Sequence, residues 1–321
     1  MLTRRSMMLA SIAAGVTMNG RTVLAKASQP ATPVNFDIPA GACDCHTHIH
    51  PDPAKFPFFA GRVYTPELAS PEEMTALHKA LKMERVVIVT PSIYGPDNSA
   101  TLFGMAARGA TARGIAVIDD KTSEADLDAM GKAGIRGIRL NLATGGVNDP
   151  TVGRPRFSAA VERVKARGWH VQLFTSLSMI TAIKDLVLTS PVPVVFDHFG
   201  GAQAALGVGQ PGFADLVELV KSGKAHVKIS GAYRASKLGP DFADATPLAQ
   251  ALIAANADRI VWGTDWPHPD SVTPPGKQIS DVTPLFQIDD GRLLNQLPVW
   301  TSDAAVRKKI LVDNPARLYG F

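Results

Sequence analysis

The sequence predicts an α/β fold, namely a distorted (β/α)8, or TIM, barrel with an insertion between its eighth strand and its last helix. Three observations predict it. Eight short apolar runs that read as strands alternate with helix-like segments along the chain. Several of these runs are apolar at nearly every position, as expected for parallel strands buried on both faces. Polar residues typical of catalysis stand at the ends of these runs, where a barrel carries its active site.

The strands are taken from the apolar runs in chain order. Val86-Val87-Ile88-Val89 and Val192-Pro193-Val194-Val195-Phe196 are the most continuous examples. A doubly wound open sheet is the alternative architecture, but no glycine-rich phosphate loop follows the first run. The expected strands span 42–49, 85–90, 114–119, 137–142, 170–175, 192–198, 225–230 and 259–264.

The helices are taken from the segments between the strands. Ser302 is the expected N-cap of the last helix, because serine side chains often accept a bond from the first turn. Residues 276–300 fit neither element and are expected to form an insertion over the barrel mouth, where long loops shape substrate pockets. The expected helices span 71–83, 99–107, 123–132, 157–166, 177–188, 212–221, 247–256 and 302–311.

Residues 1–27 are expected to be an export signal rather than part of the fold. A basic head with Arg4-Arg5 precedes a run of apolar or small residues, and Ala25-Lys26-Ala27 matches a small-x-small cleavage site. The paired arginines are similar to a twin-arginine signal. The apolar run is too short for a membrane span, so no stable anchor is expected. The sequence therefore predicts a periplasmic domain, residues 28–321, with a disordered tail at the N-terminus as the alternative.

Composition excludes several classes of function. The chain has 321 residues, of which 45% are hydrophobic, so it can bury a large core. Its formal charge of +4 comes from four basic residues within 1–27, a stretch without acids, so the remainder has a formal charge of zero. No basic run with interleaved aromatics is present. We therefore expect a small-molecule partner and no nucleic acid.

The first strand contains Asp44-Cys45-His46-Thr47-His48. Because side chains two apart on a strand share a face, Asp44, His46 and His48 are expected to project together. Cys43 and Cys45 would then point the other way and pack under helices as small apolar groups. A disulfide between positions two apart would be strained, so none is expected.

In a barrel, side chains at the ends of different strands meet at one mouth. His46 and His48 end the first strand and Asp265 ends the eighth. The sequence adds residues from the strands and loops between them, namely Arg139, Asn141, His198 and Arg234. A hydrolytic site is the expected outcome.

Asp265 is the candidate general base. It lies amid Trp262, Trp266 and Pro267, so partial desolvation is expected to raise its pKa unless nearby cations counter it. His46 and His48 could polarise a carbonyl directly or bind a divalent metal with Asp265 as a third ligand. A turn-capping role for Asp265 and a structural role for the histidine pair are the alternatives.

Three segments carry a family resemblance: Asp44 to His48, Asp197-His198-Phe199-Gly200, and Trp262-Gly263-Thr264-Asp265-Trp266-Pro267-His268. With them the chain resembles the amidohydrolase superfamily, in its amidohydrolase-related family, and most of all the metal-independent lactonases that open pyrone dicarboxylates. Zinc-dependent relatives supply a histidine from the fifth strand or a carboxylated lysine from the fourth. This chain has Gln172 in the former and Arg139 and Asn141 in the latter.

The resemblance implies a lactonase that requires no cofactor. His46, His48 and His198 would polarise the lactone carbonyl while Asp265 activates water. Arg139 and Arg234 would bind a substrate carboxylate, and the pocket would be lined by Ser92, Tyr94 and Asn98, together with Asp97. The branch carries a second arginine where this chain has Ala143-Thr144-Gly145-Gly146. A lactone with one carboxylate, of the muconolactone or sugar-acid type, is therefore expected in preference to a pyrone dicarboxylate.

Two other functions remain open. One is a zinc-dependent hydrolase or decarboxylase that uses His46, His48, Asp265 and His198. The other is a periplasmic binding barrel without catalysis, which the complete set of three histidines and an aspartate disfavours.

Overall fold

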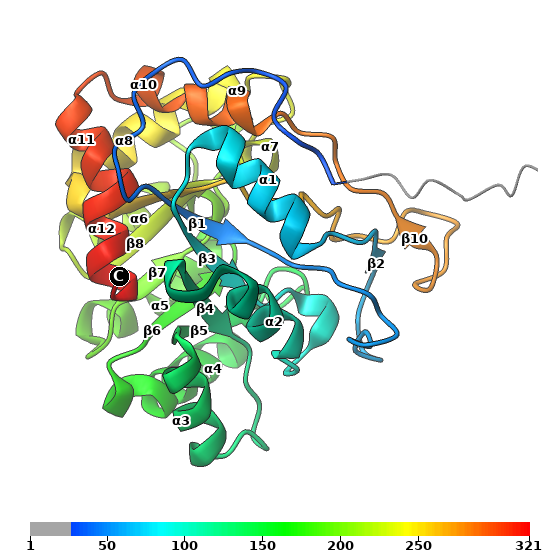
Figure 1. Cartoon of the computed structure of the whole chain (residues 1–321). Helices are drawn as coiled ribbons and strands as arrows, with labels where there is room; N and C mark the ends of the chain where they lie inside the picture. The colour runs from blue at the N-terminus through cyan, green and yellow to red at the C-terminus, as the bar shows by residue number, and fades with distance from the viewer. Residues whose placement is uncertain (1–26) are drawn as a thin grey trace, which may run out of the picture.

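The computed structural model describes residues 27–321, so the expected export signal lies outside the described residues except for Ala27. Eight parallel strands form one sheet in chain order, wrapped by helices (Figure 1), which confirms the predicted barrel. The strands are β1 Cys43–Thr47, β3 Arg85–Val89, β4 Ala112–Ala116, β5 Ile135–Asn141, β6 His170–Phe174, β7 Val194–Phe196, β8 Ala225–Ser230 and β9 Ile260–Gly263.

The barrel closes where β1 meets the chain that follows β9. His48 N donates to Trp266 O at 2.8 Å, and Asp265 N donates to His46 O at 2.8 Å. Gly263 permits this approach, since a Cβ there would lie 2.7 Å from the backbone nitrogen of His46. The closure therefore brings the two ends of the sheet, and the residues predicted to react, to the same place.

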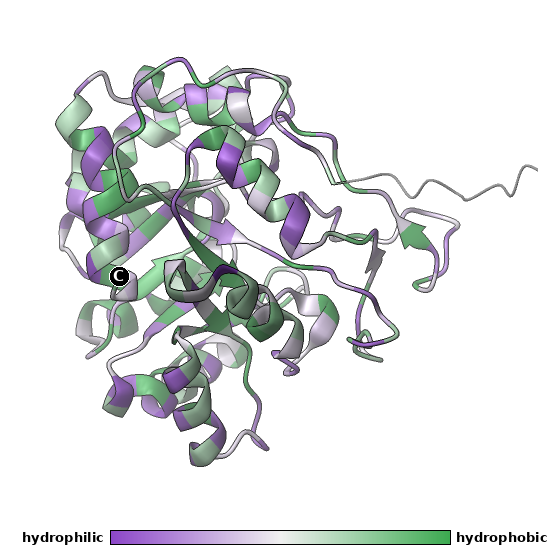
Figure 2. Cartoon of the chain, in the orientation of Figure 1, coloured by the Kyte–Doolittle hydropathy of each residue, from purple (hydrophilic) through white to green (hydrophobic). Residues whose placement is uncertain are grey.

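The helices cover the outside of the sheet and alternate with the strands. Figure 2 shows both hydrophobic and hydrophilic stretches on the surrounding helices. Ser70 and Ser123 begin α1 and α3 with capping boxes, in which side chains satisfy the free amides of the first turn. The main helices are α1 Pro71–Leu81, α2 Ser99–Arg108, α3 Glu124–Ala133, α4 Pro150–Val164, α5 Leu177–Thr189, α6 Phe213–Lys221 and α8 Thr246–Asn256, and the shorter ones are α7 Ala232–Ala235, α9 Asp290–Asn295, α10 Leu297–Trp300, α11 Ala304–Lys308 and α12 Asn314–Tyr319.

The starts of two helices, α4 and α11, differ from the prediction by more than one residue. Helix α4 begins seven residues early, at Pro150, because Asp149 caps it by accepting from Thr151 N at 2.8 Å. Pro155 lies inside this helix, and because proline is disfavoured within helices, the sequence did not predict the first turns. Ser302 is not an N-cap, since Asp303 accepts from Ala305 N at 2.8 Å and begins α11 instead.

The insertion predicted at 276–300 is only partly irregular. Its first half contributes β10, Val282–Thr283, which pairs in parallel with β2, Thr65–Pro66, away from the barrel (Figure 1). Its second half holds α9 and α10. His268 is buried and binds Asp290 of α9 at 3.0 Å, so this histidine fastens the insertion to the barrel.

The alternation predicted for β1 is wrong. β1 contains a bulge between Asp44 and Thr47: Asp44 pairs with Val86 and Thr47 with Ile88, so three residue steps along β1 correspond to only two along β3. Asp44 therefore faces outward, where it accepts from His78 of α1 at 3.2 Å, while His46 turns inward. The two cysteines also lie inside, as free thiols below His46 rather than under helices, in a cluster with Val87, Val89, Ile115, Val261 and Tyr319.

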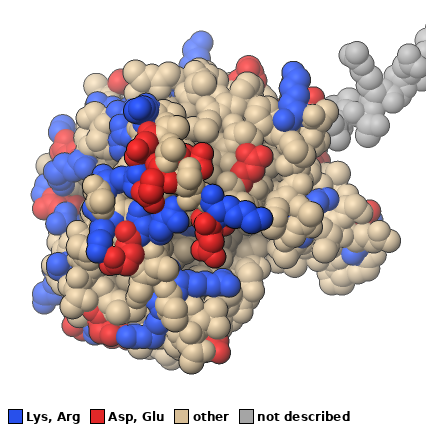
Figure 3. Space-filling model, turned by 90° about the horizontal axis from the view of Figure 1, so that it is seen from below, with Lys and Arg blue, Asp and Glu red and all other residues tan. Residues whose placement is uncertain are grey.

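The surface and the helices carry two further observations. Figure 3 shows lysine and arginine interspersed with aspartate and glutamate over one face. Among the helices that the structure describes, none has both the length and the apolar character needed to cross a membrane.

Candidate active site

The predicted residues meet at the carboxyl ends of the strands. Asp265 lies at their centre and is fully buried. Its backbone has a left-handed φ of 68°, a conformation that aspartate tolerates better than most residues. One carboxylate oxygen is held from behind, because Oδ2 accepts from Tyr233 Oη at 2.6 Å and from Nε of Arg234.

The other oxygen of Asp265 faces three imidazoles. Oδ1 lies 3.5 Å from Nε2 of His46, 3.5 Å from Nε2 of His48 and 3.7 Å from Nε2 of His198. No residue between 27 and 321 hydrogen-bonds to this atom. A buried carboxylate oxygen without a partner is costly, and it points to a group that binds there during function.

Asp265 does not have the raised pKa that its apolar neighbours suggested. Burial raises the pKa, but the charge of the adjacent Arg234 guanidinium outweighs it and leaves the pKa well below its usual range. Asp265 is therefore ionised at neutral pH, as an acceptor must be.

His48 and His198 are oriented from behind by different partners. Nδ1 of His48 donates to Val89 O at 2.7 Å, so a neutral His48 has a bare Nε2 that accepts. Nδ1 of His198 lies 3.0 Å from the Ser230 hydroxyl, which has no other side-chain partner in the described part of the chain. Donation by that hydroxyl leaves the His198 proton on Nε2. Burial lowers the pKa of His198 to about 4, so the ring is neutral at pH 7.

A buried polar cluster forms the floor of the site below His46. Asp197 Oδ2 accepts from Arg139 Nε at 3.1 Å and from Gln172 Nε2 at 3.1 Å. Lys228 donates to Gln172 Oε1 at 2.7 Å and lies 3.2 Å from Nδ1 of His46. Burial and the charge of Lys228 hold the pKa of His46 well below its usual range, so this ring is also neutral.

Asp265, His48 and His198 line a narrow central pocket. Its lining comprises His48, Tyr64, Pro91, Ser92, Arg139, Asn141, Thr144, Phe174, His198, Arg234, Asp265, Pro269 and Ser271.

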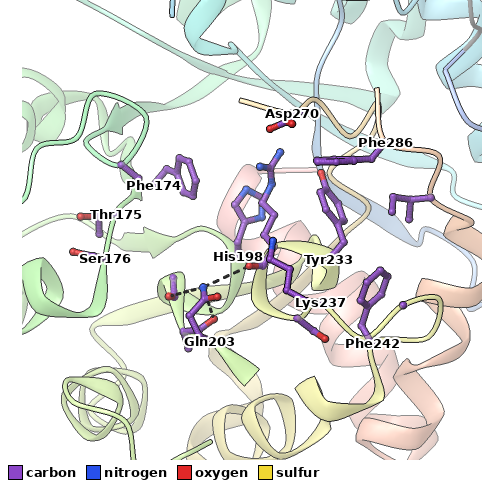
Figure 4. Close-up of a pocket in the computed structure, with 17 residues that line it drawn as sticks. Phe174, Thr175, Ser176, His198, Gln203, Tyr233, Lys237, Phe242, Asp270 and Phe286 are labelled. Atoms are coloured by element: carbon purple, nitrogen blue, oxygen red, sulfur yellow. Dashed lines mark hydrogen bonds between the residues drawn. The ribbon is translucent and has the colours of Figure 1, made fainter. Parts of the chain in front are cut away.

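A cavity of about 620 Å³ adjoins this pocket and shares Phe174, His198 and Arg234 with it. Figure 4 shows His198 and Tyr233 between Phe174 on one side and Phe286 on the other, with Lys237 and Phe242 beyond. A second cavity of about 520 Å³ shares Ser92, Arg139 and Asn141 with the central pocket. The site therefore has room for substituents on both sides.

The two predicted substrate arginines both reach the central pocket. Neither is a surface ion pair, since Arg139 is buried against Asp197 and Arg234 is largely buried against Asp265. The Nε atom of each is engaged by a carboxylate, and Nη2 of Arg234 also donates to Pro269 O at 3.1 Å. Each arginine thus makes a structural bond and also lines the pocket.

Of the three residues predicted to line the pocket from the loop after the second strand, only one does so. Ser92 lines the pocket, but Tyr94 is buried against Phe58, outside the central pocket. Asn98 also lies elsewhere, because its amide donates to Val117 O at 2.8 Å and accepts from Thr90 Oγ1 at 2.8 Å.

Sequence reasoning missed three residues of the site, Tyr64, Tyr233 and Lys228. Only Lys228 carried a signal, as a single charge inside the apolar run 225–230. The tyrosines follow no pattern because they come from loops or a short helix.

The proposed alternative metal ligands have suitable spacing. Ligand atoms of His46, His48 and Asp265 lie within 4.8 Å of one another. In tetrahedral zinc sites with bonds of about 2.0–2.2 Å, neighbouring ligand atoms are about 3.3–3.6 Å apart. The distances around Asp265 Oδ1 match this, and the bare Nε2 of His48 fits a ligand. By spacing and donor type, these residues could hold zinc.

Comparisons with known proteins give one consistent relationship. The family model described as amidohydrolase matches residues 43–321. A 4-sulfomuconolactone hydrolase of Hydrogenophaga intermedia is 34% identical, with 90% of this chain and 91% of that protein covered. A 2-pyrone-4,6-dicarboxylate hydrolase of Comamonas testosteroni is 32% identical, covering 91% and 94%. An Agrobacterium tumefaciens crystal structure superimposes with a TM-score of 0.73 at 28% identity, covering 90% of this chain and 98% of that one.

Proposed function

The chain belongs to the amidohydrolase family, and from this premise we propose that it is a hydrolase that opens the ring of a carboxylated lactone. The observation that carries the proposal is Asp265, an ionised carboxylate with one free oxygen among three imidazole nitrogens. This is what hydrolysis of an ester requires: an acceptor for the proton of water beside donors for the carbonyl. The two relatives named for lactone hydrolysis support the substrate class.

The attacking water is activated between Asp265 and His48. Asp265 Oδ1 and the bare Nε2 of His48 both accept, and they lie 3.5 Å apart, so one water can donate to each. As the water oxygen bonds to the carbonyl carbon, its proton passes to Oδ1. His48 in this role orients the nucleophile, which differs from the carbonyl-polarising role that the resemblance implied for it.

The carbonyl oxygen is stabilised by the other two histidines. His198 presents a neutral Nε2–H, because Ser230 occupies its Nδ1. His46 faces the same space with its Nε2. The negative charge that develops on the oxygen is then bound by these donors in a water-poor site, where such bonds are strong. When the ring C–O bond breaks, Asp265 returns its proton to the leaving oxygen, which yields a hydroxyl group and a carboxylic acid. The carboxylic acid keeps the second proton of the water and releases it to solvent at neutral pH, as its ordinary pKa requires.

The lactone's carboxylate binds Arg139 and Arg234. Arg139 on β5 and Arg234 in α7 both line the central pocket, and the Arg139 guanidinium lies over the ring of Phe174, which also lines it. No arginine stands in the loop Ala143-Thr144-Gly145-Gly146, so a lactone with one carboxylate, such as a muconolactone or a sugar-acid lactone, is the preferred substrate over a pyrone dicarboxylate.

A lactone panel tests this function. Purified protein is treated with a chelator and assayed against muconolactones, sugar-acid lactones and pyrone dicarboxylates, each with and without its carboxylate. We expect turnover of a monocarboxylated lactone without added metal. Activity that disappears with the chelator and returns with Zn²⁺ would instead establish the second candidate function.

That second candidate is a zinc-dependent hydrolase or decarboxylase, favoured by the ligand-like spacing of His46, His48 and Asp265. A bound zinc ion would supply Lewis-acid polarisation and a more acidic water. Asp265 would then be a ligand held in place by Tyr233 and Arg234, and His198 would be left to move protons. Metal analysis of untreated protein separates the two candidates.

We also propose that the protein is exported to the periplasm by the twin-arginine route. The support is the order of the basic pair, the apolar run and the small residues in 1–27.

A further inference from the structure

Lys228 is a cation buried inside the barrel that the proposed reaction does not use. It lies in the middle of β8 and is fully buried. Its Nζ has three neighbours that could accept a hydrogen bond, namely Gln172 Oε1 at 2.7 Å, His46 Nδ1 at 3.2 Å and Asp197 Oδ1 at 3.5 Å. A buried ammonium group is costly and is retained where these contacts serve a purpose.

Nδ1 of His46 has two neighbours with opposite requirements. Lys228 can only donate, so a bond to it needs a bare Nδ1. Asp197 Oδ1, at 3.2 Å, can only accept, so a bond to it needs a proton on Nδ1. The neighbour that binds Nδ1 therefore decides which nitrogen of His46 carries the proton.

The orientation of the groups favours a hydrogen bond from Lys228 to His46 Nδ1 over one from His46 Nδ1 to Asp197. The contact from Lys228 Nζ to His46 Nδ1 has hydrogen-bond geometry. Asp197 Oδ1 has no hydrogen-bond partner within residues 27–321, although His46 Nδ1 is close to it, so a proton on Nδ1 would not point at this oxygen. Asp197 is already engaged through Oδ2 by Arg139 and Gln172.

We propose that Lys228 is a positioning residue that donates to Nδ1 of His46 and so keeps the imidazole proton on Nε2. The catalytic consequence rests on the proposed function: Nε2–H is then a donor aimed at the lactone carbonyl, matching His198. A second consequence concerns metals. A protonated Nε2 offers no lone pair, so Lys228 makes His46 a poor ligand in a cluster whose spacing otherwise suits zinc.

The direct test is the tautomer of His46 in the whole protein labelled with ¹⁵N-histidine. Long-range ¹H–¹⁵N correlation spectra distinguish the two tautomers, and the His46 signals are assigned by their loss in His46→Gln. We expect a protonated Nε2 in the unsubstituted protein. A proton on Nδ1 would overturn the proposal, and this measurement needs no substitution at Lys228.

Lys228→Met removes the donor and keeps the length of the side chain. Without that donor, the proton of His46 should be free to occupy Nδ1. Calorimetric titration with Zn²⁺ alone should then show a gain in affinity of about ten-fold or more, the size of effect typical of groups that orient metal ligands. For the lactone reaction, kcat should fall about 10²-fold, as when one oxyanion donor is lost, while KM changes little.

Gln172→Met is the matched control, because it removes the other hydrogen bond of Lys228 and leaves Nζ beside His46. It should retain both the tautomer and the Zn²⁺ affinity of the unsubstituted protein. If Lys228→Met leaves the tautomer unchanged, or if both variants change it alike, Lys228 is only structural. A tautomer shift with gained Zn²⁺ affinity, in a protein that opens no lactone, would sustain the role of Lys228 and refute the proposed function.

Discussion

Each imidazole of the site owes its chemistry to the atom behind it. A backbone carbonyl behind His48 makes the outer nitrogen of a neutral ring an acceptor, and in the proposed mechanism the hydroxyl behind His198 donates to Nδ1 and leaves its outer nitrogen a donor. Two histidines a few ångströms apart can therefore have opposite hydrogen-bonding roles, one as an acceptor and the other as a donor. The same reasoning gives the two carboxylate oxygens of Asp265 different roles, because only Oδ1 is free.

Asp265→Asn should reduce turnover far more than binding. The amide keeps the shape of the side chain but cannot accept a proton from water, and loss of a general base typically costs about 10²- to 10⁴-fold in kcat. KM should change little, because the arginines carry substrate binding. Steady-state kinetics on the best lactone measures both. If Asp265→Asn kept near-full kcat while His198→Asn abolished it, the base would be His198.

Arg139→Met should mainly raise KM. A charge-assisted bond to a carboxylate contributes about 1.5–3 kcal/mol, so KM should increase about ten-fold or more. Arg154→Met is the matched control, because it removes an arginine that pairs with Asp185 at the surface. A fall in kcat larger than the rise in KM would mean that Arg139 acts through Asp197, to which it is bonded.

The sequence could predict which residues meet at the site but not their surroundings. His46, His48, His198 and Asp265 were found because a barrel brings strand ends together, whatever the details. The pKa of Asp265 could not be foreseen, because it depends on the guanidinium of Arg234, which reaches it from the short helix α7. Tyr94 and Asn98 were placed in the pocket by motif position alone, and local packing directs them elsewhere.

At the scale of elements, the bulge in β1 decides which side chains face the interior. Strict alternation placed Asp44 with His46 and His48, whereas one extra residue turns Asp44 toward α1. A bulge leaves little trace in a single sequence, because it is set by how two strands pair. The eight strands themselves were predictable, since each must be apolar to fill both the barrel interior and the layer beneath the helices.

Gly263→Ala should weaken the closure of the barrel. The new Cβ would lie 2.7 Å from the backbone nitrogen of His46 and 2.8 Å from its Cβ, so β1 must move away from β9. We expect a loss of about 1–3 kcal/mol in the free energy of unfolding, as for other overpacked sites. Because His46 moves with the strand, kcat should fall too. Denaturant unfolding and kinetics measure the two effects.

Gly209→Ala provides the comparison, because a Cβ at that position meets nothing within 4 Å. It should leave both quantities unchanged. Equal behaviour of the two variants would show that the close approach at Gly263 is not required.

For the whole molecule, buried neutral histidines predict a loss of stability in mild acid. Burial lowers the pKa of both His50 and His170 to about 3. In the unfolded chain their pKa is about 6.5, so between these values the unfolded state binds more protons. Stability is therefore fully present above pH 6.5 and declines as pH falls, by up to about 1.4 kcal/mol per pH unit for each histidine.

Thermal unfolding at a series of pH values checks this. Tm should decrease steadily from pH 7 to about pH 5.5, a range above the ordinary pKa values of carboxylates. Replacing His170 by Gln should make the decrease of Tm with falling pH smaller, whatever the substitution does to Tm at pH 7. A Tm that stays constant over this range would contradict the assignment of these rings as buried and neutral.

The last prediction concerns where the folded protein works. Cleavage after Ala27 would leave Ser28 at the start of the chain, and the structure already engages this residue, because Ser28 O accepts from Trp266 Nε1 at 3.0 Å. Trp266 follows Asp265, so the start of the expected mature domain supports the turn that holds the proposed base. We therefore expect a protein that folds before export and keeps its N-terminus docked afterwards. Replacing Arg4 and Arg5 together by Lys should leave uncleaved protein in the cytoplasm, whereas Arg21→Lys, outside the pair, should not. Fractionation with immunoblotting reads the outcome, and unchanged export of the double variant would refute the twin-arginine route.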